Sequence, residues 1–184
     1  MTVRKILTEP NKILRQKSLI VEKVDKDIQK LMDEMLETLY AAPGIGLAAI
    51  QIGVAKRVIV IDIGRNRDRD QDQDKEPQRN PMYFVNPEIV WKSEEKFTYE
   101  EGCLSVPNQF AEIDRSKQCH VKYLDYNGHS QELKAEGLLA TCIQHEIDHL
   151  EGILFIDYLS KLKKSMIIKK LSKQKKENVE RIVV

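Results

Sequence analysis

The segment from Leu138 to Gly152 constrains the fold most strongly, because it is expected to form a helix with two histidines on one face. It has no proline and no glycine before Gly152, which stands where a helix commonly ends. His145 and His149 are four residues apart, so both imidazoles can bind one metal ion. Glu146 lies about 100° around the helix from His145, where a general base would act on a metal-bound water. The pattern predicts a metal-dependent hydrolase, although two surface histidines on an ordinary helix can show this spacing by chance.

A catalytic site of this kind needs a third protein ligand. One class of metalloproteases supplies a histidine six residues after the second one, but this chain has Phe155 there. Glu151 and Asp157 are nearby carboxylates without a recognisable ligand motif. Cys103, between a glycine and a short apolar segment, is the stronger candidate, because a thiolate binds transition metals well. Two imidazoles and one thiolate leave a fourth position open for water, as in catalytic sites.

Cys142 offers a competing interpretation. It shares the helix face of the two histidines and could, with Cys103, complete a structural zinc site of four ligands. The point midway between the histidines, however, is roughly 7.5 Å along the helix axis from Cys142. Helical side chains also lean toward the N-terminus, away from that point. We therefore expect Cys142 to line a pocket next to the ligands.

The composition predicts one domain covering residues 1–184. The chain is 41% hydrophobic and carries a net charge of +1, which suits an ordinary globular core and argues against wholesale binding to DNA. Three cysteines and the lack of a signal-peptide pattern predict a cytoplasmic protein. No apolar run is long enough to span a bilayer. We expect a monomer without a membrane partner.

Local patterns predict the other elements. Asp25 is a suitable N-cap for an amphipathic helix that ends before Pro43, whereas the residues before it form an irregular arm without a functional role. A mobile polar loop is expected over residues 65–80, where five positive charges offset five negative ones. Strands are expected at residues 57–62, around 83–85, 89–91 and 97–99, and at 118–125 and 130–135, the last two joined at Asn127-Gly128.

The segment from Pro43 to Gly53 is rich in small residues. It is either a tight packing turn or the wall of a substrate cleft, and it lacks the features of a phosphate-binding loop. Gln51 is its one polar side chain. The Gln51 amide could donate a hydrogen bond to a developing oxyanion, or it could simply be satisfied by the backbone.

The end of the chain, residues 160–184, is strongly basic. Nine lysines and arginines stand against two glutamates between Lys161 and Arg181. An apolar stripe predicts an amphipathic helix there; its members are Leu162, Met166, Ile167 and Leu171. This helix is either a solvated charged element or a docking element for phosphate-rich RNA or an acidic membrane surface.

Three segments together resemble the signature motifs of peptide deformylases. They are residues 44–51 (GIGLAAIQ), 101–105 (EGCLS) and 144–150 (QHEIDHL). The resemblance implies removal of the N-formyl group from formyl-methionyl nascent peptides, with release of formate. It also implies a ferrous ion on Cys103, His145 and His149, replaceable by nickel, cobalt or zinc. The basic helix, from Lys161 to Lys176, resembles the element with which bacterial members dock on the ribosome.

The resemblance extends to the chemistry of the site. Glu146 is expected to act as general base toward the metal-bound water, and the metal and the Gln51 amide are expected to hold the oxyanion. The resemblance implies that the Leu104 backbone N–H also holds it. A substrate peptide is expected to lie along a strand edge near Gly46 and Gly102. An apolar pocket for the methionine side chain is expected from Ile45, Leu138 and Cys142. One departure is Phe110, where many bacterial members carry an arginine.

We expect an α+β fold, with mixed antiparallel β-sheets packed around a central helix that carries the two histidines. An N-terminal amphipathic helix and a C-terminal basic helix complete it. Two other function classes remain open on the sequence. A metalloprotease would share Glu146 and the histidines but lacks the downstream histidine, and a metal-stabilised RNA-binding module would leave Glu146 and Gln51 without a role.

Overall fold

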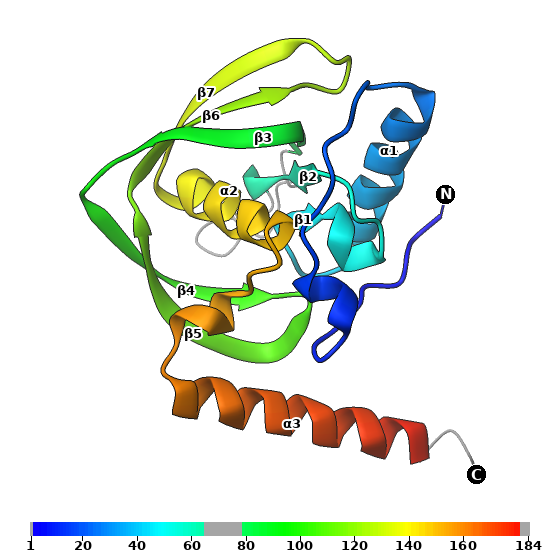
Figure 1. Cartoon of the computed structure of the whole chain (residues 1–184), viewed down its shortest axis with the longest axis vertical. Helices are drawn as coiled ribbons and strands as arrows, with labels where there is room; N and C mark the ends of the chain where they lie inside the picture. Colours follow the sequence, from blue (N-terminus) through cyan, green and yellow to red (C-terminus); the bar gives the residue numbers. More distant parts are fainter. Residues whose placement is uncertain (1, 65–78, 181–184) are drawn as a thin grey trace, which may run out of the picture.

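The computed structural model describes residues 2–64 and 79–180, with side chains described up to residue 174. It has the expected α+β fold (Figure 1). A five-stranded sheet has the order β1-β2-β3-β6-β7, and β4 and β5 form a second, two-stranded sheet. All pairings between the described strands of these two sheets are antiparallel. The strands are β1 (Gly46–Ala48), β2 (Val58–Ile61), β3 (Met82–Lys92), β4 (Lys96–Cys103), β5 (Val106–Ser116), β6 (Gln118–Leu124) and β7 (Ser130–Glu136).

Two helices bear out the sequence patterns. Helix α1 (Lys26–Ala41) begins at Asp25, whose side chain accepts hydrogen bonds from the backbone N–H groups of Asp27 and Ile28. Its apolar face packs against β1 and β2. Helix α2 (Gly137–Leu150) carries both histidines and lies between the two sheets (Figure 1). Gly152 has a positive φ of 75°, so the chain turns there as expected.

The sheet predictions were partly wrong. The two strands expected around 83–85 and 89–91 are one strand, β3, interrupted by irregular pairing with β6 near Asn86 and Pro87. Asn86 has a positive φ of 51°, which explains why the strand pattern is broken there. The strand expected at 97–99 extends to Cys103, and the sequence reasoning missed β5 altogether. The hairpin of β6 and β7 is confirmed.

Helix α3 (Lys161–Glu180) lies beside the two-stranded sheet, and its apolar stripe differs from the predicted one. Leu171 is buried and Ile167 packs against the same cluster, as expected, but Ile168 joins them instead of Leu162 and Met166. The last two are 72% and 63% exposed. The cause is helical spacing, because positions 167, 168 and 171 share one face, whereas Leu162 and Met166 lie on roughly the opposite side of the helix.

Two predicted segments lie partly outside the described residues. Of the expected loop at 65–80, only Arg79 and Asn80 are described, and residues 181–184 of the tail also lie outside. Within the described ranges, no helix combines the length and the apolar character needed to cross a bilayer.

Asp157 joins three segments of the chain. Its carboxylate pairs with Arg15 at 2.5 Å and with Lys164 of α3 at 2.6 Å, and it accepts a hydrogen bond from the Leu154 backbone N–H at 2.9 Å. Burial alone would raise the pKa of Asp157, but these three partners lower it below its ordinary value. The ionised carboxylate therefore stabilises the folded state.

Replacing Asp157 by asparagine is expected to lower the free energy of unfolding by about 1 kcal/mol at neutral pH. Because the folded-state pKa is depressed, this stabilisation is complete above the unfolded value of roughly 4 and is lost as pH falls through the folded value. Urea unfolding of both proteins should show a gap at pH 7 that narrows at pH 3. A gap of equal size at both pH values would contradict the assignment.

Candidate metal centre

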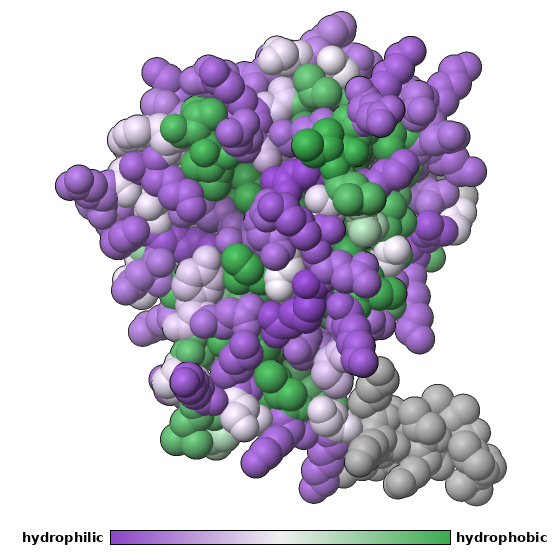
Figure 2. Space-filling view, in the orientation of Figure 1, coloured by the Kyte–Doolittle hydropathy of each residue, from purple (hydrophilic) through white to green (hydrophobic). Residues whose placement is uncertain are grey.

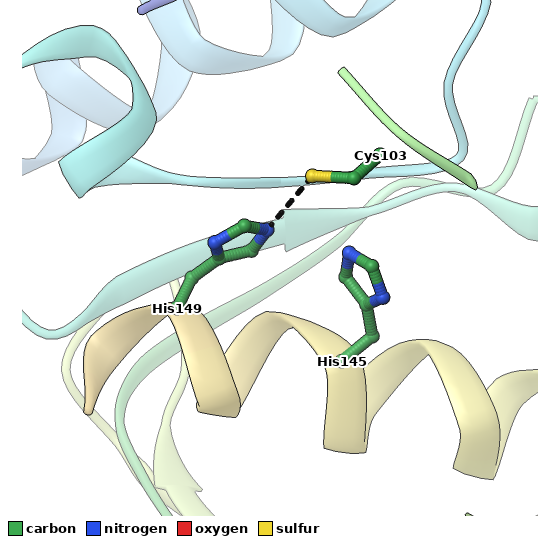
Figure 3. Close-up of side chains that lie close together, drawn as sticks. All are labelled: Cys103, His145 and His149. Atoms are coloured by element: carbon green, nitrogen blue, oxygen red, sulfur yellow. Dashed lines mark hydrogen bonds between the residues drawn. The ribbon is translucent and has the colours of Figure 1, made fainter. Parts of the chain in front are cut away.

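Three side chains from two elements meet at one point. Cys103 stands at the end of β4, and His145 and His149 project toward it from α2 (Figure 3). One nitrogen or sulfur atom from each lies within 4.8 Å of the others, and Cys103 Sγ is 3.3 Å from His149 Nε2. A tetrahedral ion with ordinary bond lengths separates its nitrogen and sulfur ligands by about 3.5 Å. The donor set and its spacing therefore fit one transition-metal ion.

A buried network fixes the orientation of His145. Its Nδ1 lies 2.8 Å from a Glu101 oxygen, which leaves Nε2 to face the centre. Arg115 donates to both oxygens of Glu101, at 2.5 and 3.0 Å, and also to Asp148 at 2.7 Å. Tyr158 donates its hydroxyl to the same Asp148 carboxylate. None of these four supporting roles was predicted from the sequence.

The surroundings set the charge of each imidazole. Burial, followed by the nearby His145, lowers the pKa of His149 well below its ordinary value, so this ring is neutral and its lone pair is available. Burial also acts to lower the pKa of His145, but hydrogen bonds to Cys103 and Glu101 raise it well above the ordinary value. Since a metal binds the neutral ring, an ion at this centre takes the place of the His145 proton.

The cysteine is surrounded by hydrogen-bond donors. The Ser105 backbone N–H donates to Cys103 Sγ at 3.4 Å, and Gln51 Nε2 lies 3.7 Å from the same sulfur. Both donors approach the sulfur atom that would bind the metal, and a cysteine binds metal as its thiolate. Cys142 does not join this cluster. It lies against Gly46 instead, so the four-ligand structural site is not formed.

The expectation that the backbone satisfies Gln51 is confirmed for its side-chain oxygen. Its side-chain oxygen accepts a hydrogen bond from the Ala48 backbone N–H at 2.8 Å. That bond turns the amide nitrogen the other way, toward Ser105 Oγ at 3.1 Å and toward Cys103. The backbone therefore orients a donor that faces the candidate metal centre.

Glu146 lies beside the ligands, as helical geometry predicted. It is almost fully buried, and this burial raises the pKa of Glu146 to about 7. Its Oε2 atom is buried and has no hydrogen-bond partner among the described residues. A carboxylate with a free oxygen and a pKa near neutrality can accept and return a proton. The charge of a bound metal would lower this pKa.

A cavity of about 540 Å³ opens next to the centre. All five residues predicted to bind substrate line it, together with Gln51, Cys103, Leu104, His145 and Glu146; the five are Ile45, Gly46, Gly102, Leu138 and Cys142. Strand β1 is at the edge of its sheet, so among the described residues no strand pairs with Gly46 on the side away from β2. An extended peptide could add to that edge.

The N-terminal arm, which was expected to lack a functional role, lies against this site. Ile6 lines the cavity. The Leu7 backbone N–H donates to the Gln51 carbonyl at 2.7 Å, and the Glu9 N–H donates to the Ser105 carbonyl at 2.8 Å. The arm thus ties two of the motif segments together. Its residues carry no local motif, and for this reason sequence reasoning did not find the role.

Replacing Gly46 by alanine is expected to lower kcat/KM of the enzyme by about 10- to 100-fold, because the added methyl group displaces the general-base candidate. An added Cβ would overlap Glu146 Oε1 and lie 2.8 Å from Cys142 Sγ. Steady-state kinetics test this, with metal content and thermal midpoint measured on the same protein. Unchanged kinetics would show that β1 does not confine Glu146.

Comparison with known proteins identifies the family. A model of the polypeptide deformylase family matches residues 3–165. The chain belongs to the peptide deformylase family. A peptide deformylase from Pelagibacter ubique is 65% identical over 179 residues, which cover 97% of this chain and 99% of that protein. The crystal structure of an Ehrlichia chaffeensis peptide deformylase is 46% identical and covers 97% of this chain and 99% of its own, with a TM-score of 0.88.

A second crystal structure, of the Ehrlichia chaffeensis peptide deformylase in complex with actinonin, has a TM-score of 0.86 and covers 95% of this chain and 98% of its own. Peptide deformylases are metal-dependent hydrolases, and the activity of this family member is removal of the N-formyl group from nascent peptides.

Proposed function

We propose that Cys103, His145 and His149 bind the catalytic metal of this deformylase. The observation that carries the proposal is the convergence of their three donor atoms at the spacing of one ion. Ferrous iron is the native metal that the family resemblance implies, and nickel, cobalt or zinc could replace it, because imidazole and thiolate ligands suit all four. Glu101 holds His145 in the orientation that this binding needs.

The protein groups around the centre have separate roles in the hydrolysis. A metal ion bound by these three ligands would lower the pKa of a bound water molecule and would polarise the formyl carbonyl. Glu146 takes a proton as the water oxygen attacks the formyl carbon. It then gives that proton to the amine nitrogen as the carbon–nitrogen bond breaks, which releases formate and the free N-terminus. Gln51 Nε2 and the Leu104 backbone N–H donate to the developing oxyanion.

The cavity accommodates formyl-methionine at the start of a peptide. The methionine side chain enters the apolar part formed by Ile45, Leu138 and Cys142. The peptide backbone runs along the free edge of β1 at Gly46, opposite Gly102 of β4. A buried apolar pocket beside the reacting carbonyl selects a long unbranched side chain such as methionine.

We also propose that the chain acts as one domain and as a monomer in the cytoplasm, and that helix α3 docks on ribosomal RNA through the lysines from Lys161 to Lys176. Lys161, Lys163, Lys169 and Lys170 are exposed, so their charges are available to phosphate groups. Such docking would place the cavity near emerging nascent chains.

Formate release from formyl-Met-Ala-Ser tests the proposed function. The protein is purified without oxygen, and its metal content is determined on the same sample. Activity that follows the ferrous iron content and decays in air supports both the site and its metal. A protein that contains iron, nickel or cobalt at one ion per chain but releases no formate would refute the proposal.

A further inference from the structure

A second hollow lies between strand β5 and helix α3. This hollow, which we call the β5–α3 groove, has a volume of about 690 Å³. Phe110, Ala111 and Glu112 line it from β5, and Lys163, Met166 and Lys170 line it from α3. In the lower part of Figure 2, apolar atoms reach the surface between hydrophilic side chains over α3.

The groove adjoins the cavity beside the candidate metal centre. Gln109 and Phe110 line both hollows, so the two hollows meet at these side chains. Phe110 pairs with Gly102 across the β4–β5 ladder, and its ring lies so close to Gly102 that an added Cβ there would be 2.6 Å from it. Gly102 precedes the candidate ligand Cys103. The Phe110 ring therefore marks the point where the cavity ends and the groove begins.

The surface of the groove suits a polypeptide with mixed side chains. Phe110 and Met166 are 66% and 63% exposed and face it from opposite sides. Large apolar side chains that line an exposed hollow commonly mark a binding surface. Lys163 and Lys170 give the α3 side a positive charge, opposed by Glu112 alone among the charged residues of the groove lining.

The length of an extended peptide determines which substrate residues lie over the β5–α3 groove. A formyl group at Cys103 places the first residues of the substrate beside Gly102, which pairs directly with Phe110. At about 3.3 Å per residue, two or three residues bring the chain past the Phe110 ring. Residues from about the fourth onward then lie over the groove.

We propose that the β5–α3 groove binds the substrate polypeptide from about its fourth residue, with apolar side chains packed between Phe110 and Met166. This inference rests on the proposed function, because the register starts from the reacting formyl group. Acidic side chains are favoured beside Lys163 and Lys170. The enzyme is thus selective for the sequence that follows formyl-methionine, at positions that short model substrates do not reach.

The test compares two formylated octapeptides with formyl-Met-Ala-Ser. One octapeptide continues after Met-Ala-Ser with leucines and glutamate, and the other with serines and glycines. For the natural enzyme, kcat/KM is expected to be about three- to tenfold higher for the apolar octapeptide than for the polar one, mainly through KM. In Met166→Asp this ratio is expected to fall close to one, because the charged group removes the apolar wall.

Leu162→Asp is the matched control. Leu162 lies one helical turn before Met166 and is 72% exposed, but it does not line the groove. Its variant should keep the natural ratio. Equal kcat/KM for both octapeptides in the natural enzyme, together with activity on formyl-Met-Ala-Ser, would overturn the groove proposal alone. If kcat/KM is equal for the two octapeptides and analytical ultracentrifugation shows a dimer, the groove instead binds a second copy of the chain. No activity on any substrate by the metal-loaded protein would instead overturn the proposed function.

Discussion

The Glu146→Gln enzyme is expected to release formate from formyl-Met-Ala-Ser with a kcat about 10² to 10⁴ times lower than that of the natural enzyme. The carboxamide has the size of the carboxylate but cannot take a proton from water. KM is expected to change little, because Glu146 acts in the transition state and not on the bound substrate. Steady-state kinetics with a formate-coupled assay, on protein of known metal content, measure both quantities.

The control for this variant is Glu151→Gln. Glu151 is the next glutamate along the chain, but its carboxylate faces Lys17 and Arg57 near the surface and not the cavity. Its replacement should leave kcat within about twofold, since a partly exposed ion pair contributes little to the fold. The general-base role is wrong if Glu146→Gln keeps its metal and more than a tenth of the natural kcat.

The sequence predicted those parts of the molecule that show a helical repeat of apolar residues or a motif of closely spaced residues. Helices α1 and α2 follow from apolar spacing and from their caps, and the histidine spacing on α2 placed two candidate ligands. Cys142 was also assigned correctly to the cavity wall, because helical geometry alone excluded it from the centre. These inferences use residues that are neighbours in the chain.

The remaining features depend on contacts between distant residues. Arg115 is one of several charged residues in β5, a strand that the sequence patterns did not predict, yet it is only 5% exposed. It is buried because the β4–β5 sheet packs against α2, where Glu101 and Asp148 flank the guanidinium. A buried arginine between two carboxylates needs this complete arrangement, since loss of one partner leaves an uncompensated charge. The spacing of Glu101, Arg115 and Asp148 in the sequence does not show that these three residues meet in the fold.

The burial of this network also explains how a cysteine and a histidine from separate motifs meet. Glu101 is two residues before Cys103 on β4 and contacts His145 on α2 directly. The same carboxylate therefore aligns the imidazole and fixes the strand that carries the thiolate. The Glu101–His145 contact therefore positions both ligands, and a displacement of β4 or of α2 would move both of them.

Replacing Cys103 by alanine is expected to reduce metal content to well below one ion per chain and to lower kcat/KM by more than about 10³-fold. Two imidazoles alone bind a divalent ion much more weakly than two imidazoles with a thiolate, and the charge balance of the centre changes as well. Metal analysis after dialysis, together with the formate assay at saturating ferrous iron, measures the two effects separately. Activity that returns at high iron concentration would show that the thiolate contributes mainly affinity.

Cys119→Ala is the matched control, because it also removes one thiol but at a residue outside the candidate metal group. Cys119 is fully buried in β6, within the apolar cluster that packs beneath α2, and does not belong to the candidate metal group. Loss of its sulfur should cost about 1 kcal/mol of stability and leave metal content near that of the natural protein. If Cys103→Ala retains a full complement of metal, the third ligand must be another residue. The two cysteine variants together therefore distinguish a ligand from a core residue.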